Sequence, residues 1–247
     1  MQKIGVFDSG VGGMTVLAVL REALPGSHFL YLGDTAHVPY GTKSREQVRV
    51  LSRQAAETFR IKNIDLLVVA CNTASSIALD VFTEVLAPVP VLGVVAAGAH
   101  VARQKHALMR PEAPILVLAT RATIASHAYM KALVGLVCLE QACPLLVPLI
   151  EEGWIDHPVL DQVLLEYIKP YLHLEPGIVL LGCTHYPWIT ASILRALPGW
   201  HIVHSAQAVA EQVCSIFPNM QGSGHMEWIF TDEAALPAFA RALIESA

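Results

Sequence analysis

The chain has 247 residues, of which 54% are hydrophobic and only 15% are charged, so its composition excludes a mainly disordered protein. The net charge is -5, and the 16 Lys and Arg residues form no run that could neutralise a phosphate backbone, which argues against nucleic acid as a partner. The length suits one large domain or two compact α/β domains of about 100 to 150 residues each.

Nothing in the sequence indicates export or membrane insertion. Met1-Gln2-Lys3 leads directly into the apolar run 4–7, without the regions of a signal peptide. Longer apolar runs, such as 144–150, are far shorter than the roughly 20 residues that a membrane-spanning helix needs. The five cysteines are an odd number, which favours reduced thiols over a disulfide framework. We therefore expect a cytoplasmic protein with no membrane partner.

Short apolar runs rich in Val, Ile and Leu alternate along the chain with longer stretches of helical periodicity. This alternation predicts the α/β class, with a largely parallel sheet that carries helices on its faces. In chain order, the expected strands cover 3–7, 28–32, 65–70, 90–94, 114–119, 144–148, 178–182 and 200–204. The expected helices cover 13–24, 43–62, 73–87, 98–109, 123–135, 158–173, 187–197, 206–217 and 232–245.

Three landmarks of the first half recur in the second half at one offset, 112 residues, which is the difference between Cys71 and Cys183. The pairs are Cys71 with Cys183, Asp8 with Thr120, and Tyr40-Gly41 with Glu152-Gly153. Three matches in the same order indicate a duplicated α/β unit. Ligands of open α/β sheets bind at the carboxyl ends of the strands, where these landmarks fall. We therefore expect two similar, pseudo-symmetric α/β domains with largely parallel sheets and an active site in the cleft between them.

The glycine-rich segment 8–13 joins a predicted strand to a predicted helix. It is not a dinucleotide loop, because Thr15 stands where that pattern needs its third glycine, and 41–44 is not a P-loop. Its N–H groups can still bind an anion such as a carboxylate. Taken alone, a turn of this kind is more often simple geometry than a binding site.

Two cysteines stand at strand ends with polar neighbours. Cys71 is followed by Asn72-Thr73, and Cys183 by Thr184-His185. A helix start after such a cysteine supplies N–H groups and favours the thiolate. A lone cysteine would more often be a small core residue, but two at equivalent strand ends favour chemistry. The remaining cysteines have no polar neighbourhood and are expected to fill the core: Cys138, Cys143 and Cys214.

Further polar residues gain interest from these positions. Cys183 and His185 could form a metal-ligand pair, but a structural zinc site needs four ligands, so we expect no metal site. His185 can equally be an acid/base group or a helix-capping residue. Asp8, Tyr40 and Glu152 are polar residues at strand ends. Any one of them alone would usually be a solvent-exposed loop residue. Their equivalence between the halves favours a role in a site.

At these positions the sequence closely resembles the glutamate racemase family, within the wider aspartate/glutamate racemase superfamily. The matching motifs run in order from residue 4 to residue 190: Asp8-Ser9-Gly10-Val11-Gly12-Gly13, Gly33-Asp34, Pro39-Tyr40-Gly41, Ala70-Cys71-Asn72-Thr73, 148–153 and Gly182-Cys183-Thr184-His185-Tyr186-Pro187. The resemblance implies a cofactor-independent enzyme that interconverts L-glutamate and D-glutamate and supplies D-glutamate for peptidoglycan synthesis. With it we expect a homodimer whose domains cover 1–95 plus 207–247, carrying Cys71, and 96–206, carrying Cys183.

The resemblance also assigns site residues. Cys71 and Cys183 would be the catalytic thiols, supported by Asp8, Glu152 and His185 as acid/base groups. The substrate glutamate would be held by Asp8, Ser9, Pro39, Tyr40, Gly41, Asn72, Thr73, Thr184 and His185.

Racemisation suits a pair of thiols. The reaction removes a proton from one face of an α-carbon and delivers another to the opposite face, so it needs two acid/base groups. A thiol with a pKa near 8.5 can act as either acid or base close to neutral pH. Pyridoxal phosphate would need a Schiff-base lysine, and no lysine lies at a convincing strand-end loop. We therefore expect no cofactor.

Three other functions stay open on the sequence alone. An aspartate racemase would share the two thiols and differ in side-chain recognition. A cysteine hydrolase or amidase would use Cys183 with His185, but it leaves the paired Cys71 unexplained. A two-domain binding protein would explain the duplicated fold but not a thiol in each half.

Overall fold

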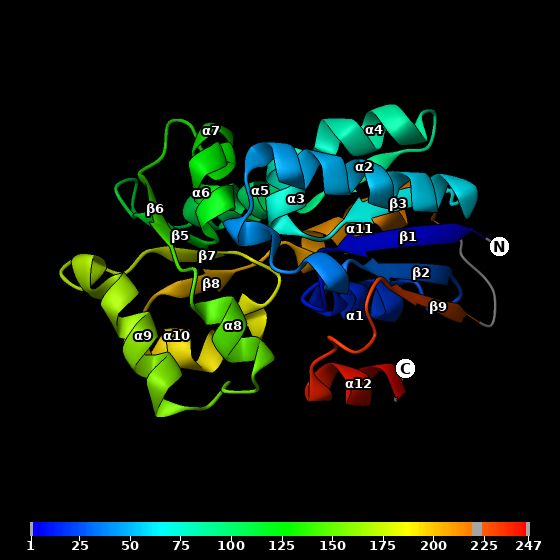
Figure 1. The fold of residues 1–247 in the computed structure, drawn as a ribbon. Coiled ribbons are helices and arrows are strands. Elements are labelled where there is room, and N and C mark those ends of the chain that lie inside the picture. The colour runs from blue at the N-terminus through cyan, green and yellow to red at the C-terminus, as the bar shows by residue number, and fades with distance from the viewer. Residues whose placement is uncertain (1, 219–223, 246–247) are drawn as a thin grey trace.

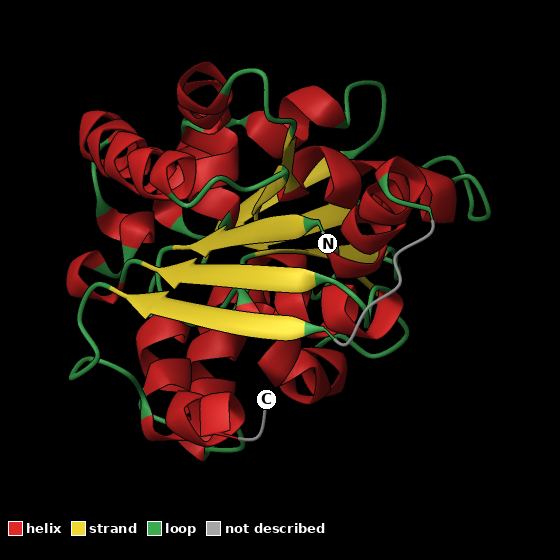
Figure 2. Ribbon diagram, turned by 90° about the vertical axis from the view of Figure 1, so that its right-hand side faces the viewer, coloured by secondary structure: helices red, strands yellow, loops and turns green. Residues whose placement is uncertain are grey.

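Two parallel β-sheets organise the chain in the computed structural model, which describes residues 2–218 and 224–245. Each sheet forms the centre of one lobe, and the two lobes lie side by side (Figure 1). Seen from the side of the first lobe, helices cover both faces of its sheet (Figure 2). We refer to the lobe with the N-terminal strand as the first domain and to the other as the second domain.

The first sheet has the strand order β4-β3-β1-β2-β9, and every neighbouring pair is parallel. The strands next to its centre are apolar runs buried on both faces, as expected where helices cover a parallel sheet on both sides. The strand bounds are β1 (Lys3–Asp8), β2 (His28–Gly33), β3 (Leu66–Val69), β4 (Val91–Gly93) and β9 (His225–Phe230).

The second sheet has the order β6-β5-β7-β8 and is also parallel throughout. Its central strands β5 and β7 are fully buried, whereas the edge strand β6 is half-buried. The strand bounds are β5 (Ile115–Ala119), β6 (Cys138–Ala142), β7 (Ile178–Gly182) and β8 (His201–Val203).

The two sheets repeat one topology, because β2-β1-β3-β4 corresponds in order to β6-β5-β7-β8. The starts of β1 and β5, Lys3 and Ile115, lie 112 residues apart, as do the starts of β3 and β7, Leu66 and Ile178. The predicted pair of pseudo-symmetric domains is therefore confirmed. Strand β9 adds to the first sheet after the chain has completed the second. The boundaries at 95/96 and 206/207 stay a prediction.

Helices cover both sheets, and α5 contributes buried residues to a core cluster of each domain. No helix within 2–218 and 224–245 combines the length and the apolar character that crossing a membrane requires. The helix bounds are α1 (Met14–Ala23), α2 (Arg45–Ile61), α3 (Asn72–Ile77), α4 (Leu79–Leu86), α5 (Val94–His106), α6 (Arg121–Ser126), α7 (Ala128–Ala132), α8 (Leu146–Glu151), α9 (Pro158–Ile168), α10 (Thr190–Ala196), α11 (Ala206–Ile216) and α12 (Ala238–Glu245). Short 3-10 turns are η1 (Thr35–His37), η2 (Tyr40–Thr42), η3 (Lys169–Tyr171) and η4 (Tyr186–Ile189).

The strand expected at 144–148 is wrong, since this segment enters helix α8. Its buried positions, Leu146, Val147 and Ile150, follow helical spacing, which places them on one face. Pro148 fits there because the N–H groups of a first helical turn have no partner within the helix. The strands β6 and β9, which both lie at sheet edges, were not predicted from the sequence.

Candidate active site

One cavity of about 20 Å³ lies where the carboxyl ends of the two sheets face each other. Loops that follow strands of both domains form its wall, so residues far apart in sequence meet there. All the predicted site residues except Asp8 and Glu152 line it. The lining residues are Ser9, Val38, Pro39, Tyr40, Gly41, Cys71, Asn72, Thr73, Thr120, Val147, Cys183, Thr184 and His185.

Cys71 caps the N-terminus of α3. Its sulfur accepts a hydrogen bond from the N–H of Ala74 at 3.5 Å and lies 3.5 Å from the hydroxyl of Ser9. Burial raises the pKa of Cys71 to about 12, and the nearby carboxylate of Asp8 adds to this, while the hydrogen bonds lower it. The expected preference of this helix start for a thiolate is therefore outweighed, and Cys71 is a thiol near neutral pH.

Cys183 follows β7 and is paired with His185. The Sγ of Cys183 lies 3.9 Å from Nδ1 of His185, and Nε2 of His185 lies 3.0 Å from Oε1 of Glu151. Burial lowers the pKa of His185, but its bonds to Cys183 and Glu151 outweigh burial and raise it to about 10. A protonated imidazolium beside Cys183 stabilises negative charge that forms on the sulfur.

Asp8 lies behind the cavity wall and joins the two domains. Its Oδ1 accepts the N–H of Gly10 at 3.0 Å, and its Oδ2 accepts the hydroxyl of Thr184 at 3.1 Å. The hydroxyl of Thr15 also donates to the carbonyl oxygen of Thr184 at 3.0 Å. Burial raises the pKa of Asp8, although His185 and these hydrogen bonds oppose the shift. The loop after β1 is thus fastened to the loop after β7.

In the structure Glu151, rather than the predicted Glu152, is the acidic residue that contacts His185. Glu152 is exposed and follows the last residue of α8, whereas Glu151 contacts His185. The 112-residue offset points to Glu152, whereas the helical phase points to Glu151. Val147 lines the cavity, and Glu151 lies four residues later on the same helix face. A helical interpretation of 146–151 could therefore have found Glu151.

Thr120 is a further lining residue that the sequence analysis named only as a landmark. It caps α6, and its hydroxyl lies 2.9 Å from that of Thr73 and 3.0 Å from that of Thr123. By the internal repeat, Thr120 corresponds to Asp8 and Thr73 to His185. Asp8 and His185, which can carry charge, therefore correspond to a pair of uncharged hydroxyl side chains in the other half of the site. Val38 and Val147 were also missed, because they have no polar signal.

The side chains of two predicted binding residues, Tyr40 and Asn72, form hydrogen bonds with other residues of the protein. The hydroxyl of Tyr40 donates to Oδ2 of Asp34 at 2.6 Å, and Thr231, just after β9, donates to Oδ1 of Asp34 at 2.7 Å. The Asn72 side chain accepts the hydroxyl of Tyr129 from the other domain at 2.5 Å. The loop that carries residues 39–41 is thereby held in place by the C-terminal strand.

No group of three or more His, Cys, Asp and Glu side chains within 2–218 and 224–245 is arranged to hold a metal ion. The same part of the chain contains the five cysteines as free thiols. That the reaction needs no cofactor stays a prediction.

Comparisons with known proteins place the chain in a family. The Asp/Glu/Hydantoin racemase family matches residues 5–213. A glutamate racemase from Aquifex aeolicus is 43% identical over 234 residues, covering 94% of this chain and 89% of the relative. The structure of glutamate racemase from Francisella tularensis in complex with D-glutamate has a TM-score of 0.89 at 31% identity, covering 99% of this chain and 92% of that one. The structure from Thermus thermophilus in complex with beta-chloro-D-alanine has a TM-score of 0.84 at 42% identity, covering 98% and 93%. The chain therefore belongs to the Asp/Glu/Hydantoin racemase family and, within it, groups with the glutamate racemases.

Proposed function

We propose that this protein is a glutamate racemase that interconverts L-glutamate and D-glutamate with Cys71 and Cys183 as its two acid/base groups. The observation that carries the proposal is that two thiols, one from each pseudo-symmetric domain, line a single cavity. The D-glutamate in the Francisella relative supports the choice of substrate. The product would supply the D-glutamate of bacterial peptidoglycan.

The proposed reaction transfers one proton to one thiol and another proton from the other thiol. With L-glutamate, the Cys183 thiolate takes the α-proton and becomes a thiol, leaving the electron pair at the α-carbon. The Cys71 thiol then gives its proton to the opposite face and becomes a thiolate. D-glutamate follows the reverse course, with Cys71 as the base. The resemblance to the family assigns Cys71 to the D enantiomer and Cys183 to the L enantiomer.

The surroundings of the two thiols support this assignment. Cys71 is a thiol near neutral pH, since burial and Asp8 raise its pKa. The imidazolium of His185 lies beside Cys183 and stabilises negative charge that forms on its sulfur during the reaction. These surroundings support Cys183 as the base towards L-glutamate and Cys71 as the acid.

Carbanion character at the α-carbon needs donors near the adjoining carboxylate. The hydroxyls of Ser9, Thr73 and Thr184 and the amide of Asn72 line the cavity between the two thiols' loops. Backbone N–H groups of the loops after β1, β3 and β7 are the other candidates. We infer that these groups hold the substrate and stabilise its developing charge.

Circular dichroism of L-glutamate after addition of the pure protein tests the proposed function, with L-aspartate in parallel. The signal of L-glutamate should decay to zero, and that of L-aspartate should not. Decay with aspartate alone would identify an aspartate racemase. A covalent acyl-enzyme would favour a hydrolase, and a stable signal without solvent-proton exchange would favour a binding protein.

Two finer features belong to the same proposal. We infer a cytoplasmic location, in keeping with the five free thiols, and a homodimeric assembly, which follows the family resemblance. Light scattering coupled to size-exclusion chromatography tests the assembly. A mass of one chain at micromolar concentration would contradict it.

A further inference from the structure

A chain of aromatic rings leads from the site to the C-terminal helix. The rings of His185 and Trp188 have their centroids 5.6 Å apart and cross at 85°. Trp188 in turn lies 5.0 Å from Phe239 at 76°, and Phe239 belongs to α12 of the first domain. Trp188 itself belongs to η4 of the second domain. The contact therefore joins the two domains beside His185.

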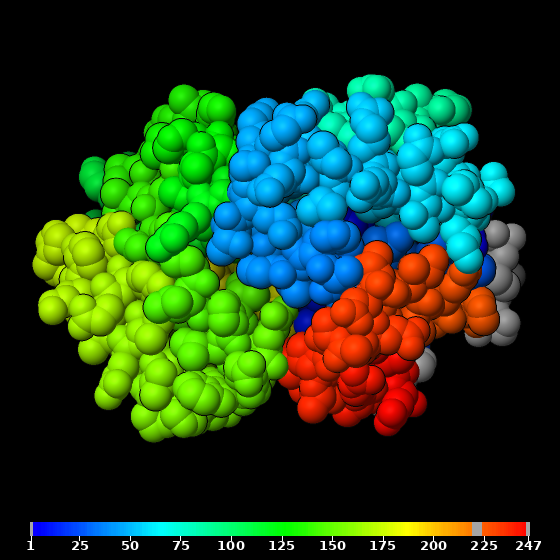
Figure 3. All heavy atoms as spheres, viewed as in Figure 1, coloured from blue at the N-terminus to red at the C-terminus, as the bar shows by residue number. Residues whose placement is uncertain are grey.

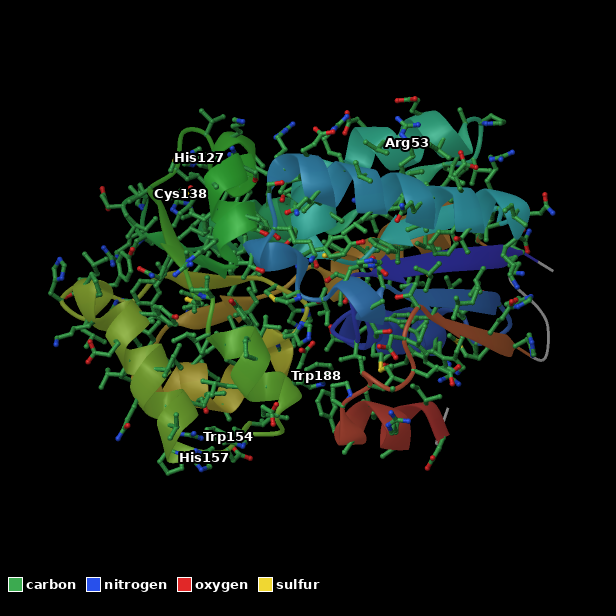
Figure 4. All side chains as sticks on the ribbon, in the orientation of Figure 1. Arg53, His127, Cys138, Trp154, His157 and Trp188 are labelled. Carbon is green, nitrogen blue, oxygen red and sulfur yellow. The ribbon has the colours of Figure 1, made fainter. Side chains whose placement is uncertain are left out.

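Trp188 takes part in the packing of both domains. Its side chain packs against a core cluster of the first domain that includes Met14 and Leu17, and against one of the second that includes Tyr186 and Ile189. Figure 4 shows Trp188 between the second domain and α12. A large side chain held from both sides has few alternative positions.

The ring of His185 needs a support of this kind. Both of its nitrogens are engaged, Nδ1 towards Cys183 and Nε2 towards Glu151, so a small rotation of the ring would lengthen both contacts. The neighbouring titratable groups are Cys183 on its own segment, Glu151 on α8 and Asp8 at the end of β1. Trp188 adds an uncharged aromatic surface whose ring centre lies 5.6 Å from that of His185, so it limits how far the His185 ring can turn.

We propose that Trp188 is a positioning residue that orients the His185 ring towards Cys183, and that Phe239 of α12 holds Trp188 for this task. The C-terminal helix thereby becomes part of the catalytic apparatus of the second domain. The inference rests on the proposed racemase activity for its kinetic consequence, but the ring contact has its own readout.

The experiment compares Trp188→Leu, Trp188→Phe and Phe239→Leu with a matched control. The second domain has another Trp–His ring pair, Trp154 and His157, with centroids 4.6 Å apart, which Figure 4 shows at the far end of that domain. Trp154→Leu is the control, because it removes a tryptophan from a histidine outside the site. NMR titration of the His185 ring, assigned by its absence in His185→Asn, is measured beside kcat and KM.

Trp188→Leu should lower the measured pKa of His185 and lower kcat by about tenfold with little change in KM, since aromatic contacts to a cation change an equilibrium by about twofold to thirtyfold. Phe239→Leu should act in the same direction with a smaller effect, Trp188→Phe should restore most of both values, and Trp154→Leu should change neither. If Trp188→Leu does not fold, Trp188→Phe and Phe239→Leu carry the comparison.

An unchanged His185 titration and an unchanged kcat in a folded Trp188→Leu or Phe239→Leu protein would overturn the inference. A wild-type protein without racemase activity would instead contradict the proposed function. In that case the His185 titration still decides whether Trp188 acts on the ring.

Discussion

The two halves of the site have the same backbone arrangement but differ in their charged side chains. Asp8 and His185 belong to one half of the site. At the equivalent positions of the other half, the repeat places Thr120 and Thr73. Burial raises the pKa of Cys71, with a smaller contribution from Asp8, whereas Cys183 lies beside the His185 imidazolium. The proposed two-thiol reaction would therefore use thiols in unlike surroundings.

The adjacent residues Glu151 and Glu152 offer a matched comparison. With Cys183, Glu151 is one of the two partners that raise the pKa of His185, so Glu151→Gln should lower kcat by about tenfold to a hundredfold. Glu152→Gln changes an exposed side chain and should leave kcat within about twofold. Steady-state kinetics in both directions measure this. A larger loss in Glu152→Gln than in Glu151→Gln would show that the assignment to Glu151 is wrong.

His185 should also make stability depend on pH. Its pKa in the folded protein is about 10, above the unfolded value of about 6.5, so its contribution is fully present below about pH 6.5 and is lost as the pH rises through 10. Urea unfolding of the wild type should give a free energy of unfolding that falls between pH 7 and pH 9. His185→Asn should give a flatter curve.

Below pH 9 the thiol of Cys71 adds little to this slope. Its pKa is raised from 9.0 to about 12, so its own destabilising effect begins only where an unfolded thiol ionises. Parallel curves for wild type and His185→Asn would mean that His185 is neutral in the folded protein.

At the scale of elements, the sequence pattern predicts those strands whose burial produces a continuous apolar run. Strands β1, β3, β5 and β7 are buried on both faces and therefore read as continuous apolar runs. The edge strands β6 and β9 are only half-buried and contain polar residues such as Glu140 and Glu227, so they lack that signal. Helix α8 was taken for a strand because a short apolar run does not distinguish the two.

The residues of the site also fall into some that the sequence predicts and others that it does not. Cys71 and Cys183 could be predicted because they are chemically distinctive and recur at a fixed offset. Val38 and Val147 could not, because only the packing of the two domains brings these apolar residues to the cavity. Glu151 and Glu152 are indistinguishable until the phase of α8 is known. Long-range packing therefore accounts for most of what the sequence left open.

The loops after β1 and β7 fit together through a glycine. A Cβ on Gly12 would lie 2.3 Å from Oγ1 of Thr184 and 2.4 Å from Nδ1 of His185, so these site side chains would have to move. Gly12→Ala should lower kcat at least about tenfold, at a stability cost of about 1–3 kcal/mol. Kinetics and thermal unfolding measure the two effects.

Gly98→Ala provides the control for this change. A Cβ there would meet only ordinary contacts, the nearest at 3.4 Å from the hydroxyl of Tyr129, and Gly98 lies within helix α5. Because alanine favours a helix over glycine by about 0.5–1 kcal/mol, this variant should be at least as stable and equally active. A fully active Gly12→Ala protein would mean that the two loops do not need their observed fit.

At the scale of the whole molecule, the two domains are closed on each other. On the face seen in Figure 3 the lobes are in contact, and the cavity of about 20 Å³ between them has room for little more than one water molecule. Glutamate is several times larger than that. We therefore expect the domains to separate when the substrate binds or leaves.

Small-angle X-ray scattering checks this movement. Without ligand, the population of separated domains should give a larger radius of gyration than with saturating D-glutamate, which we propose contacts the loops of both domains. Hydrogen exchange of residues 8–13 and 183–186 should slow in parallel. Identical scattering and identical exchange with and without D-glutamate would contradict a hinge between the domains.

The central claim is that each face of the α-carbon has its own thiol, and proton exchange with deuterated water tests it most directly. At early times the wild type should place solvent deuterium in the inverted product and almost none in the recovered substrate, starting from either enantiomer. Cys71→Ser and Cys183→Ser should each fold and lose at least about a hundredfold in racemisation, because a hydroxyl is a poor acid or base near neutral pH. Equal early labelling of substrate and product, or near-normal racemisation by either serine variant, would contradict the two-thiol account.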